Sequence, residues 1–162
     1  ARAWLGKDDE GLAWQVARWM RARSCQRIFA TGHSLGGALA TLLAGADERV
    51  ELITFGSPRV GDRAFAKRFV GRPVRRYVEC RDLIARVPPE PLFAHVGALH
   101  YVDRHGGIQV DPDASFIAAD RRAGGFDYLR RHAWRPGNVL LRGLADHAPI
   151  NYVTAVLGLR ES

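Results

Sequence analysis

Short hydrophobic runs alternate with amphipathic segments along most of this chain. Residues 27–31, 49–55 and 74–80 are rich in β-branched and other apolar residues and predict buried strands. Between them, residues 38–44 are apolar nearly all round, as in a buried helix, and residues 62–70 carry apolar residues on one side only. Strands that alternate with helices predict an α/β fold with a parallel sheet and flanking helices.

An amphipathic helix is predicted before the first strand, over residues 8–23. Its apolar positions recur at helical spacing and are Leu12, Val16, Trp19 and Met20. Acidic residues at positions 8–10 stand where a helix N-terminus favours negative charge. We expect Trp14 and Trp19 to pack in the core, because aromatic residues on such a helix usually do; the alternative is a lipid-facing pair.

In the second half of the chain, proline-rich and polar segments interrupt the alternation of strands and helices. Prolines at 88, 89 and 91 predict a loop, and residues 99–110 predict a hairpin that turns near Gly106 and Gly107. Residues 111–135 are polar and contain glycine, so no element is predicted there and a long variable loop is expected. A final helix is predicted from Pro149 to Gly158.

The most informative stretch lies between the first strand and the helix after it. It reads Thr31-Gly32-His33-Ser34-Leu35-Gly36-Gly37-Ala38 and contains the pattern G-x-S-x-G. A sharp strand-to-helix turn exposes the Ser34 hydroxyl, and Gly32 and Gly36 are expected to remove side chains that would collide there. The N–H of Leu35, at the helix N-terminus, can face an oxyanion. The strand before and the helix after favour a nucleophile elbow over a chance match.

A serine nucleophile needs a histidine base and a carboxylate to orient it. Reactive groups of parallel sheets gather beyond the carboxyl ends of the strands, and Asp82 follows the third strand closely. His147 lies on the loop that enters the last helix and is free to lean toward Ser34. The chain order Ser34, Asp82, His147 is the order that this kind of sheet uses, so we predict these three as a catalytic triad.

The other histidines are less suited to the role of base. His95 lies in the proline-rich loop and is interpreted as structural, with substrate contact as the alternative, and His132 is interpreted as a surface residue. His100, Asp103 and His105 raise the alternative of a metal site. His100 and Asp103 point to opposite faces of a strand, and no H-E-x-x-H pattern is present, so no metal is expected.

Composition and charge indicate which classes of binding partner are expected. The formal net charge is +7 and the pI is about 10.2, but the arginines are scattered and no nucleic-acid module accompanies them. We therefore expect a solvated basic surface and no nucleic-acid partner, with attraction to anionic lipid as a secondary possibility. No apolar run is long enough for a membrane span, and no signal peptide is visible. Cys25 and Cys80 fall at opposite ends of their strands, so both are expected to be free thiols.

Four motifs together resemble the class 3 lipases, the fungal-type triacylglycerol lipases of the α/β-hydrolase superfamily. They are residues 31–41 around the elbow, 53–62 (Ile-Thr-Phe-Gly-Ser-Pro-Arg-Val-Gly-Asp), 81–89 with 95–97, and 146–152 (Asp-His-Ala-Pro-Ile-Asn-Tyr). The resemblance implies an α/β-hydrolase-like fold, a lipid or ester substrate met at a lipid–water interface, and no cofactor. It also implies Ser34, Asp82 and His147 as the triad and the N–H of Leu35 as an oxyanion donor.

The chain departs from the family pattern in two places. Arg81 stands where the family commonly has Asn before the triad acid, and a guanidinium aimed at Asp82 would compete with the histidine. The family's early strands, its lid and its second oxyanion residue all lie upstream of the segment matched here. We therefore expect residues 1–162 to be a single, partial domain whose N-terminal strands are missing. Loss of one oxyanion donor typically costs about 10²- to 10³-fold in turnover.

The sequence thus predicts a serine esterase or lipase that cleaves carboxylic esters of lipids. Within enzymes the alternatives are a phospholipase A1 or a short-chain esterase with the same triad. From another class, the alternative is a lipase-fold binding module without turnover, which the Arg81 departure and the absent oxyanion residue favour. Localisation and oligomeric state are not predicted.

Overall fold

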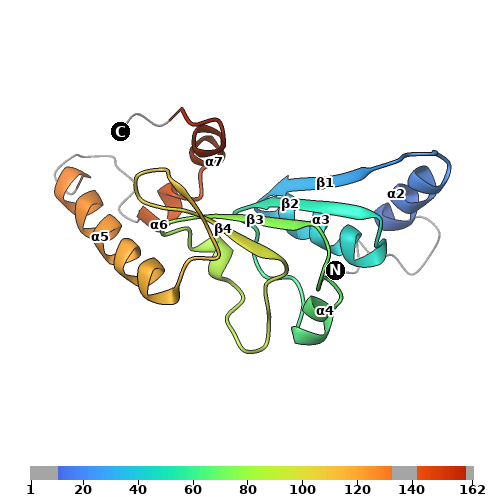
Figure 1. Cartoon of the computed structure of the whole chain (residues 1–162), viewed down its shortest axis with the longest axis horizontal. Helices are drawn as coiled ribbons and strands as arrows, with labels where there is room; N and C mark the ends of the chain where they lie inside the picture. The colour runs from blue at the N-terminus through green and yellow to red at the C-terminus, as the bar shows by residue number, and fades with distance from the viewer. Residues whose placement is uncertain (1–10, 133–141, 160–162) are drawn as a thin grey trace.

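The computed structural model describes residues 11–132 and 142–159, and its centre is a five-stranded mixed sheet (Figure 1). The strands follow one another in space as they do in sequence, and they are β1 (Ile28–His33), β2 (Val50–Phe55), β3 (Val74–Glu79), β4 (Ala98–Val102) and β5 (Ile108–Val110). Strands β1 to β4 are parallel, whereas β5 pairs antiparallel with β4. The α/β expectation is confirmed; the sheet departs from a purely parallel one at the predicted hairpin, because a short turn reverses the chain.

Helices cover both sides of this sheet. They are α2 (Leu12–Arg21), α3 (Leu35–Ala46), α4 (Arg63–Lys67), the 3₁₀ turn η1 (Ile84–Arg86), α5 (Ala114–His132), α6 (Arg142–Ala145) and α7 (Pro149–Val156). Helix α3 packs against β1 and β2, and α7 contacts β3 from the opposite side (Figure 1). The carboxyl ends of the strands therefore lie where the turn into α3, the η1 segment and the segment before α7 come together. That residues 1–162 form a single, partial domain stays a prediction.

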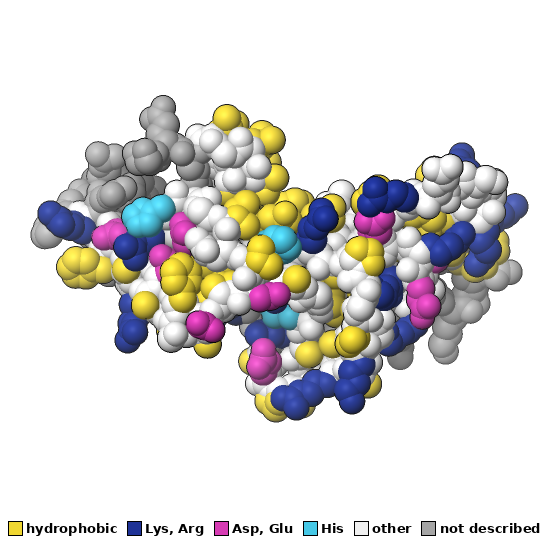
Figure 2. Space-filling model, in the orientation of Figure 1, with side chains coloured by type: hydrophobic (Ala, Val, Ile, Leu, Met, Phe, Trp, Pro, Cys, Tyr) yellow, Lys and Arg dark blue, Asp and Glu magenta, His cyan; other side chains and the backbone are white. Residues whose placement is uncertain are grey.

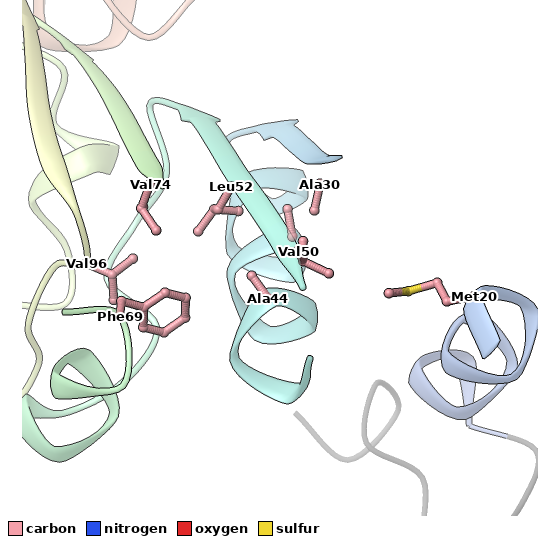
Figure 3. Close-up of a cluster of buried hydrophobic side chains, with 9 residues drawn as sticks. Met20, Ala30, Ala44, Val50, Leu52, Phe69, Val74 and Val96 are labelled. Atoms are coloured by element: carbon pink, nitrogen blue, oxygen red, sulfur yellow. The ribbon is translucent and has the colours of Figure 1, made fainter. Parts of the chain in front are cut away.

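The apolar core lies between α3 and the sheet (Figure 3). Strand β2 alternates buried and half-buried residues, and its buried side presents Val50 and Leu52 to Ala44 of α3. Phe69, which follows α4, and Val74 of β3 extend this cluster. The core thus fixes α3 against β1 and β2, which sets the direction in which the chain turns between β1 and α3.

The expectation that Trp14 and Trp19 pack in the core is wrong. Their residues are 37% and 54% exposed, while Met20 of the same helix is buried in the core cluster. Each indole instead lies beside an arginine one helical turn on, Trp19 beside Arg23 at 4.1 Å from the ring centroid. The cation–π contact accounts for how a large aromatic residue is accommodated at the surface. The acidic positions 8–10 lie outside the described residues.

The expectation of a long loop over residues 111–135 is also wrong, because α5 occupies Ala114–His132. Apolar residues form no stripe along this helix, and two adjacent glycines interrupt its pattern. Gly125 has a packing reason: a Cβ there would lie 1.7 Å from Nη1 of Arg81. The glycine that suggested a loop thus leaves room for a side chain from the end of β3.

Candidate active site

The strand-to-helix turn at Ser34 has the strained backbone that the sequence predicts. Ser34 has φ 56° and ψ −125°, a left-handed conformation that non-glycine residues rarely adopt. Its N–H donates to the carbonyl of Phe55 at 2.9 Å, which holds the turn onto β2. A Cβ on Gly32 would lie 2.3 Å from the backbone of Gly36, so only glycine fits at that position.

The second glycine of the pattern does not have the predicted role. A Cβ on Gly36 would meet no atom within 4 Å, so the collision expected there is absent among the described residues. Gly37 has that role instead, because its Cβ would lie 2.8 Å from Cβ of Ser57 and 2.9 Å from the carbonyl oxygen of Gly32. Sequence analysis missed Gly37, although the adjacent glycine pair was the available signal.

The three residues predicted as a triad are brought together. The Ser34 hydroxyl lies 2.8 Å from Nε2 of His147, and Nδ1 of His147 lies 2.9 Å from Oδ2 of Asp82. The residues come from the β1–α3 turn, the segment after β3 and the turn before α7. The 113 positions that separate Ser34 from His147 in sequence show that the fold assembles this chain of hydrogen bonds.

Asp82 is completely buried, and its two oxygens are bonded to different groups. Oδ1 accepts from the N–H groups of Ile84 and Ala85, at 2.8 and 3.2 Å. Oδ2 accepts from His147 and from the hydroxyl of Tyr152, at 2.9 and 2.5 Å. The carboxylate is therefore fixed in one orientation, with one oxygen directed at the histidine.

Tyr152 is a functional neighbour that sequence analysis missed. Burial, and then the negative charge of Asp82, raise the pKa of the Tyr152 hydroxyl well above its usual range, so it stays a proton donor to Asp82. The same hydroxyl accepts from the N–H of Glu79 at 3.1 Å. The available signal was its place in α7, one and a half helical turns after His147, which directs it toward the sheet.

Arg81 does not compete for Asp82. Its guanidinium donates to the carbonyl of Arg121 at 3.1 Å and lies against Gly125 in α5. Its backbone N–H donates to Oδ2 of Asp146, at 2.9 Å. The residue that departs from the expected pattern therefore turns away from the triad acid and anchors the residue before His147.

Leu35, the predicted oxyanion donor, is the first residue of α3. The first N–H groups of a helix have no intrahelical acceptor and point outward from the N-terminus. The N–H of Leu35 therefore belongs to the positive end of the α3 dipole, next to Ser34. Its role as a donor stays a prediction.

His95 lies apart from this chain of hydrogen bonds. Nε2 of His95 is 2.8 Å from the carbonyl of Ala85; burial, and then Arg76 and Arg59, lower the pKa of His95 to about 3. The structural interpretation of His95 is thus confirmed, and the side chain of His132 lies outside the described residues.

The residues that raised the alternative of a metal site make contacts within the hairpin and the sheet. The ring of His100 lies against that of Tyr77, with centroids 4.8 Å apart, and Asp103 accepts from the N–H groups of His105 and Gly107 in the hairpin turn. Across the part of the chain that the structure describes, no group of three or more His, Cys, Asp or Glu could hold a metal ion. Cys25 and Cys80 are not joined in a disulfide, as expected.

Apolar side chains are exposed on every segment that carries a triad residue. They are Leu35 beside Ser34, Leu83 beside Asp82, and Leu144 and Ile150 on either side of His147. An apolar pocket of about 250 Å³ lies between α7 and the sheet, lined by His33, Phe55, Pro149, Tyr152, Val153, Val156 and Leu157. Hydrophobic side chains gather at the foot of α7 in the space-filling view, whereas Lys and Arg are scattered over this face (Figure 2). None of the described helices is long and apolar enough to cross a membrane.

The chain is similar to known lipases over most of its length. Triacylglycerol lipase OBL1 of Nicotiana tabacum is 26% identical over 186 residues, covering 88% of this chain and 32% of that protein. Phospholipase A1-II 5 of Oryza sativa subsp. japonica is 32% identical over 117 residues, covering 64% of this chain and 24% of that protein. The chain thus spans about a quarter to a third of the length of these relatives.

Solved structures and a family model agree with this similarity. A crystal structure of a fungal lipase superposes with a TM-score of 0.54 at 23% identity, covering 69% of this chain and 46% of that one, and shows that the two share a fold. The family model described as lipase (class 3) matches residues 8–92, just over half of the chain. This chain belongs to the class 3 lipase family.

Proposed function

We propose that this chain is the catalytic part of a serine lipase that hydrolyses carboxylic ester bonds of lipids. The observation that carries the proposal is the chain of hydrogen bonds from the Ser34 hydroxyl through His147 to Asp82, with distances of 2.8 and 2.9 Å. It supports Ser34 as nucleophile, His147 as general base and Asp82 as the acid that orients His147.

The reaction begins when Ser34 attacks the carbonyl carbon of the ester. Nε2 of His147 takes the hydroxyl proton and then gives it to the leaving alcohol, while the buried carboxylate of Asp82 stabilises the imidazolium. The N–H of Leu35 stabilises the negative charge on the tetrahedral intermediate. Water, deprotonated by His147, then releases the carboxylic acid from the acyl-enzyme. The mechanism uses no cofactor.

Apolar surface around the triad supports a lipid substrate. Leu35, Leu144 and Ile150 are 68%, 49% and 62% exposed on the segments that carry Ser34 and His147, so an acyl chain can reach them. An acyl chain that covers them removes apolar area from water, worth about 25 cal/mol per Å². Esters with long acyl chains are therefore the expected substrates.

Hydrolysis of p-nitrophenyl esters of graded acyl length tests this function. We expect kcat/KM to rise from the acetate to the longer esters and to vanish in Ser34→Ala. Cys25→Ser is the matched control, because it changes one exposed nucleophilic side chain away from the site. Ester cleavage that is equal in the wild type and in Ser34→Ala would overturn the proposal.

Phospholipase A1 activity is the second candidate. The net charge of +7 and the similarity to the rice phospholipase A1-II 5 favour it, because a basic surface attracts anionic headgroups. Release of fatty acid from phosphatidylglycerol vesicles, compared with triacylglycerol emulsions, distinguishes the two candidates. Faster release from the vesicles, lost at high salt, would assign the phospholipase activity.

A further inference from the structure

The residue before the nucleophile makes a contact that the triad itself does not explain. Nε2 of His33 lies 2.8 Å from the backbone carbonyl oxygen of His147. The two imidazole rings also face each other, with centroids 4.6 Å apart and an angle of 35° between their planes. We propose that His33 is a positioning residue, whose ring N–H ties the backbone of the general base to the strand that leads into the nucleophile.

The proton arrangement of His33 follows from its partner. A carbonyl oxygen only accepts hydrogen bonds, so Nε2 of His33 carries a proton and donates it to His147. That nitrogen is therefore not free to take the proton of Ser34, although the two residues are adjacent in sequence. His33 acts through His147 and does not compete with it as a base.

The base needs such an anchor because His147 lies on a short turn between α6 and α7. Its N–H is bonded to the carbonyl of Leu144 at 3.2 Å, and the preceding Asp146 is held by the N–H of Arg81 at 2.9 Å. The first bond closes the turn, and the second joins it to the segment that follows β3. The bond from His33 joins it to the end of β1, immediately before Ser34.

The surroundings of His33 strengthen this bond. Its ring lines the apolar pocket beneath α7 and lies 5.8 Å from the ring of Tyr152. The hydrogen bond itself is half-buried, and partial shielding from water strengthens a hydrogen bond. A shift of about 1 Å in a catalytic group can lower a rate by about 10²-fold, so a fixed backbone at the base matters for reactivity.

A pair of variants of nearly equal shape tests this role. His33→Gln keeps an N–H donor at the end of a flexible side chain, whereas His33→Met has almost the same length and no donor. His100→Met is the matched control, because His100 lies on the same sheet and its ring lies against that of Tyr77, away from the triad. The measured quantity is the rate at which a fluorophosphonate modifies Ser34, with circular dichroism to confirm folding.

The positioning role predicts a difference between the pair. We expect His33→Met to react about tenfold more slowly than His33→Gln, the effect of one hydrogen bond, and His100→Met to react like the wild type. Equal rates for His33→Met and His33→Gln would overturn the proposal and leave only a packing role. Should His33→Met not fold, His33→Phe, which keeps a ring, replaces it in the comparison with His33→Gln.

A spectroscopic measurement separates this inference from the proposed function on which it rests. The ¹⁵N resonances of the His147 ring are recorded in the Ser34→Ala background, where no reaction takes place. We expect one narrow set both when His33 is unchanged and in His33→Gln, and broadened or shifted resonances in His33→Met. Identical spectra would overturn the positioning role, whereas a wild type that does not react with the probe would overturn the proposed function alone.

Discussion

Two buried clusters of this molecule are held together by different physical interactions. The core between α3 and the sheet, around Val50 and Leu52, consists of apolar side chains whose contacts have no preferred direction. The cluster at the carboxyl end of β3 contains Asp82, Tyr152 and His147, which are joined to one another by directional hydrogen bonds. Changes to the core should therefore alter stability alone, whereas changes to the groups of the polar cluster that act on Ser34 should alter reactivity.

Substitutions in the two clusters are expected to have different effects because apolar packing and hydrogen bonding respond differently to the loss of a group. An apolar side chain that is shortened loses contacts in proportion to the volume removed, and its neighbours partly adjust. A buried carboxylate that is replaced by a group with a donor changes which ring nitrogen of its histidine partner carries the proton. The variants below are ordered from the largest expected effect to the smallest.

The largest effect is expected for Asp82→Asn. The Asn oxygen can still accept from Ile84 and Ala85, but its amide would face Nδ1 of His147 with a donor. His147 then carries its proton on Nε2 and cannot take the proton of Ser34. We expect labelling of Ser34 by a fluorophosphonate to slow by about 10⁴-fold, as in other serine triads, while circular dichroism shows a folded chain.

Asp103→Asn is the control for this substitution, because Asp103 lies in the hairpin turn and only orders the backbone there. It should label like the wild type. Equal rates for Asp82→Asn and the wild type would mean that the carboxylate does not set the proton position of His147.

Leu52→Ala should show the opposite behaviour. Leu52 is completely buried in the core cluster, so its truncation removes packing contacts and leaves a cavity. We expect the free energy of unfolding, measured by urea denaturation, to fall by about 2–5 kcal/mol. Labelling of Ser34, corrected for the folded fraction, should stay unchanged. A labelling loss as large as that of Asp82→Asn would show that the two clusters are not separable.

Tyr152→Phe lies between the two extremes, because Tyr152 belongs to the polar cluster but does not touch the nucleophile. The substitution removes a donor to Asp82 and an acceptor for the N–H of Glu79, both of which are buried. We expect the free energy of unfolding to fall by about 1–3 kcal/mol. Tyr77→Phe is the matched control, since Tyr77 stacks on Phe55 through its ring, which the substitution keeps. Equal losses in the two variants would contradict the account.

The smallest effect is expected for Gly36→Ala. A Cβ there meets no atom within 4 Å, and alanine suits a helix better than glycine, so the unfolding free energy should change by less than about 1 kcal/mol, in the stabilising direction. Gly32→Ala is the contrast, because its Cβ would lie 2.3 Å from backbone, and should yield little folded protein. Similar yields and melting temperatures for the two variants would contradict the assigned roles.

The sequence predicted those parts of the molecule that depend on local pattern. The turn at Ser34 is encoded by adjacent residues, and the strands β1, β2 and β3 by short apolar runs. Asp82 and His147 could be placed because the carboxyl ends of parallel strands meet at one edge of the sheet. These predictions needed only chain order and the geometry of the fold class.

The features that the sequence did not predict depend on contacts between distant segments. Helix α5 was missed because its apolar residues form no stripe, and Gly125 is required only because Arg81 packs against it. Trp14 and Trp19 were misplaced because the arginines that accommodate them were not considered as partners. The bond from Tyr152 to Asp82 joins residues 70 positions apart, and the place of Tyr152 in α7 does not by itself identify this partner.

The central claim is that His147 and Asp82 make Ser34 nucleophilic. The most direct test is labelling of the purified chain by a fluorophosphonate, with the modified residue located by peptide mass spectrometry in the wild type, Ser34→Ala, His147→Ala and His100→Ala. We predict that Ser34 alone is labelled, that Ser34→Ala and His147→Ala abolish labelling, and that His100→Ala retains it. A folded wild type that is not labelled, or labelling that persists in His147→Ala, would contradict the claim.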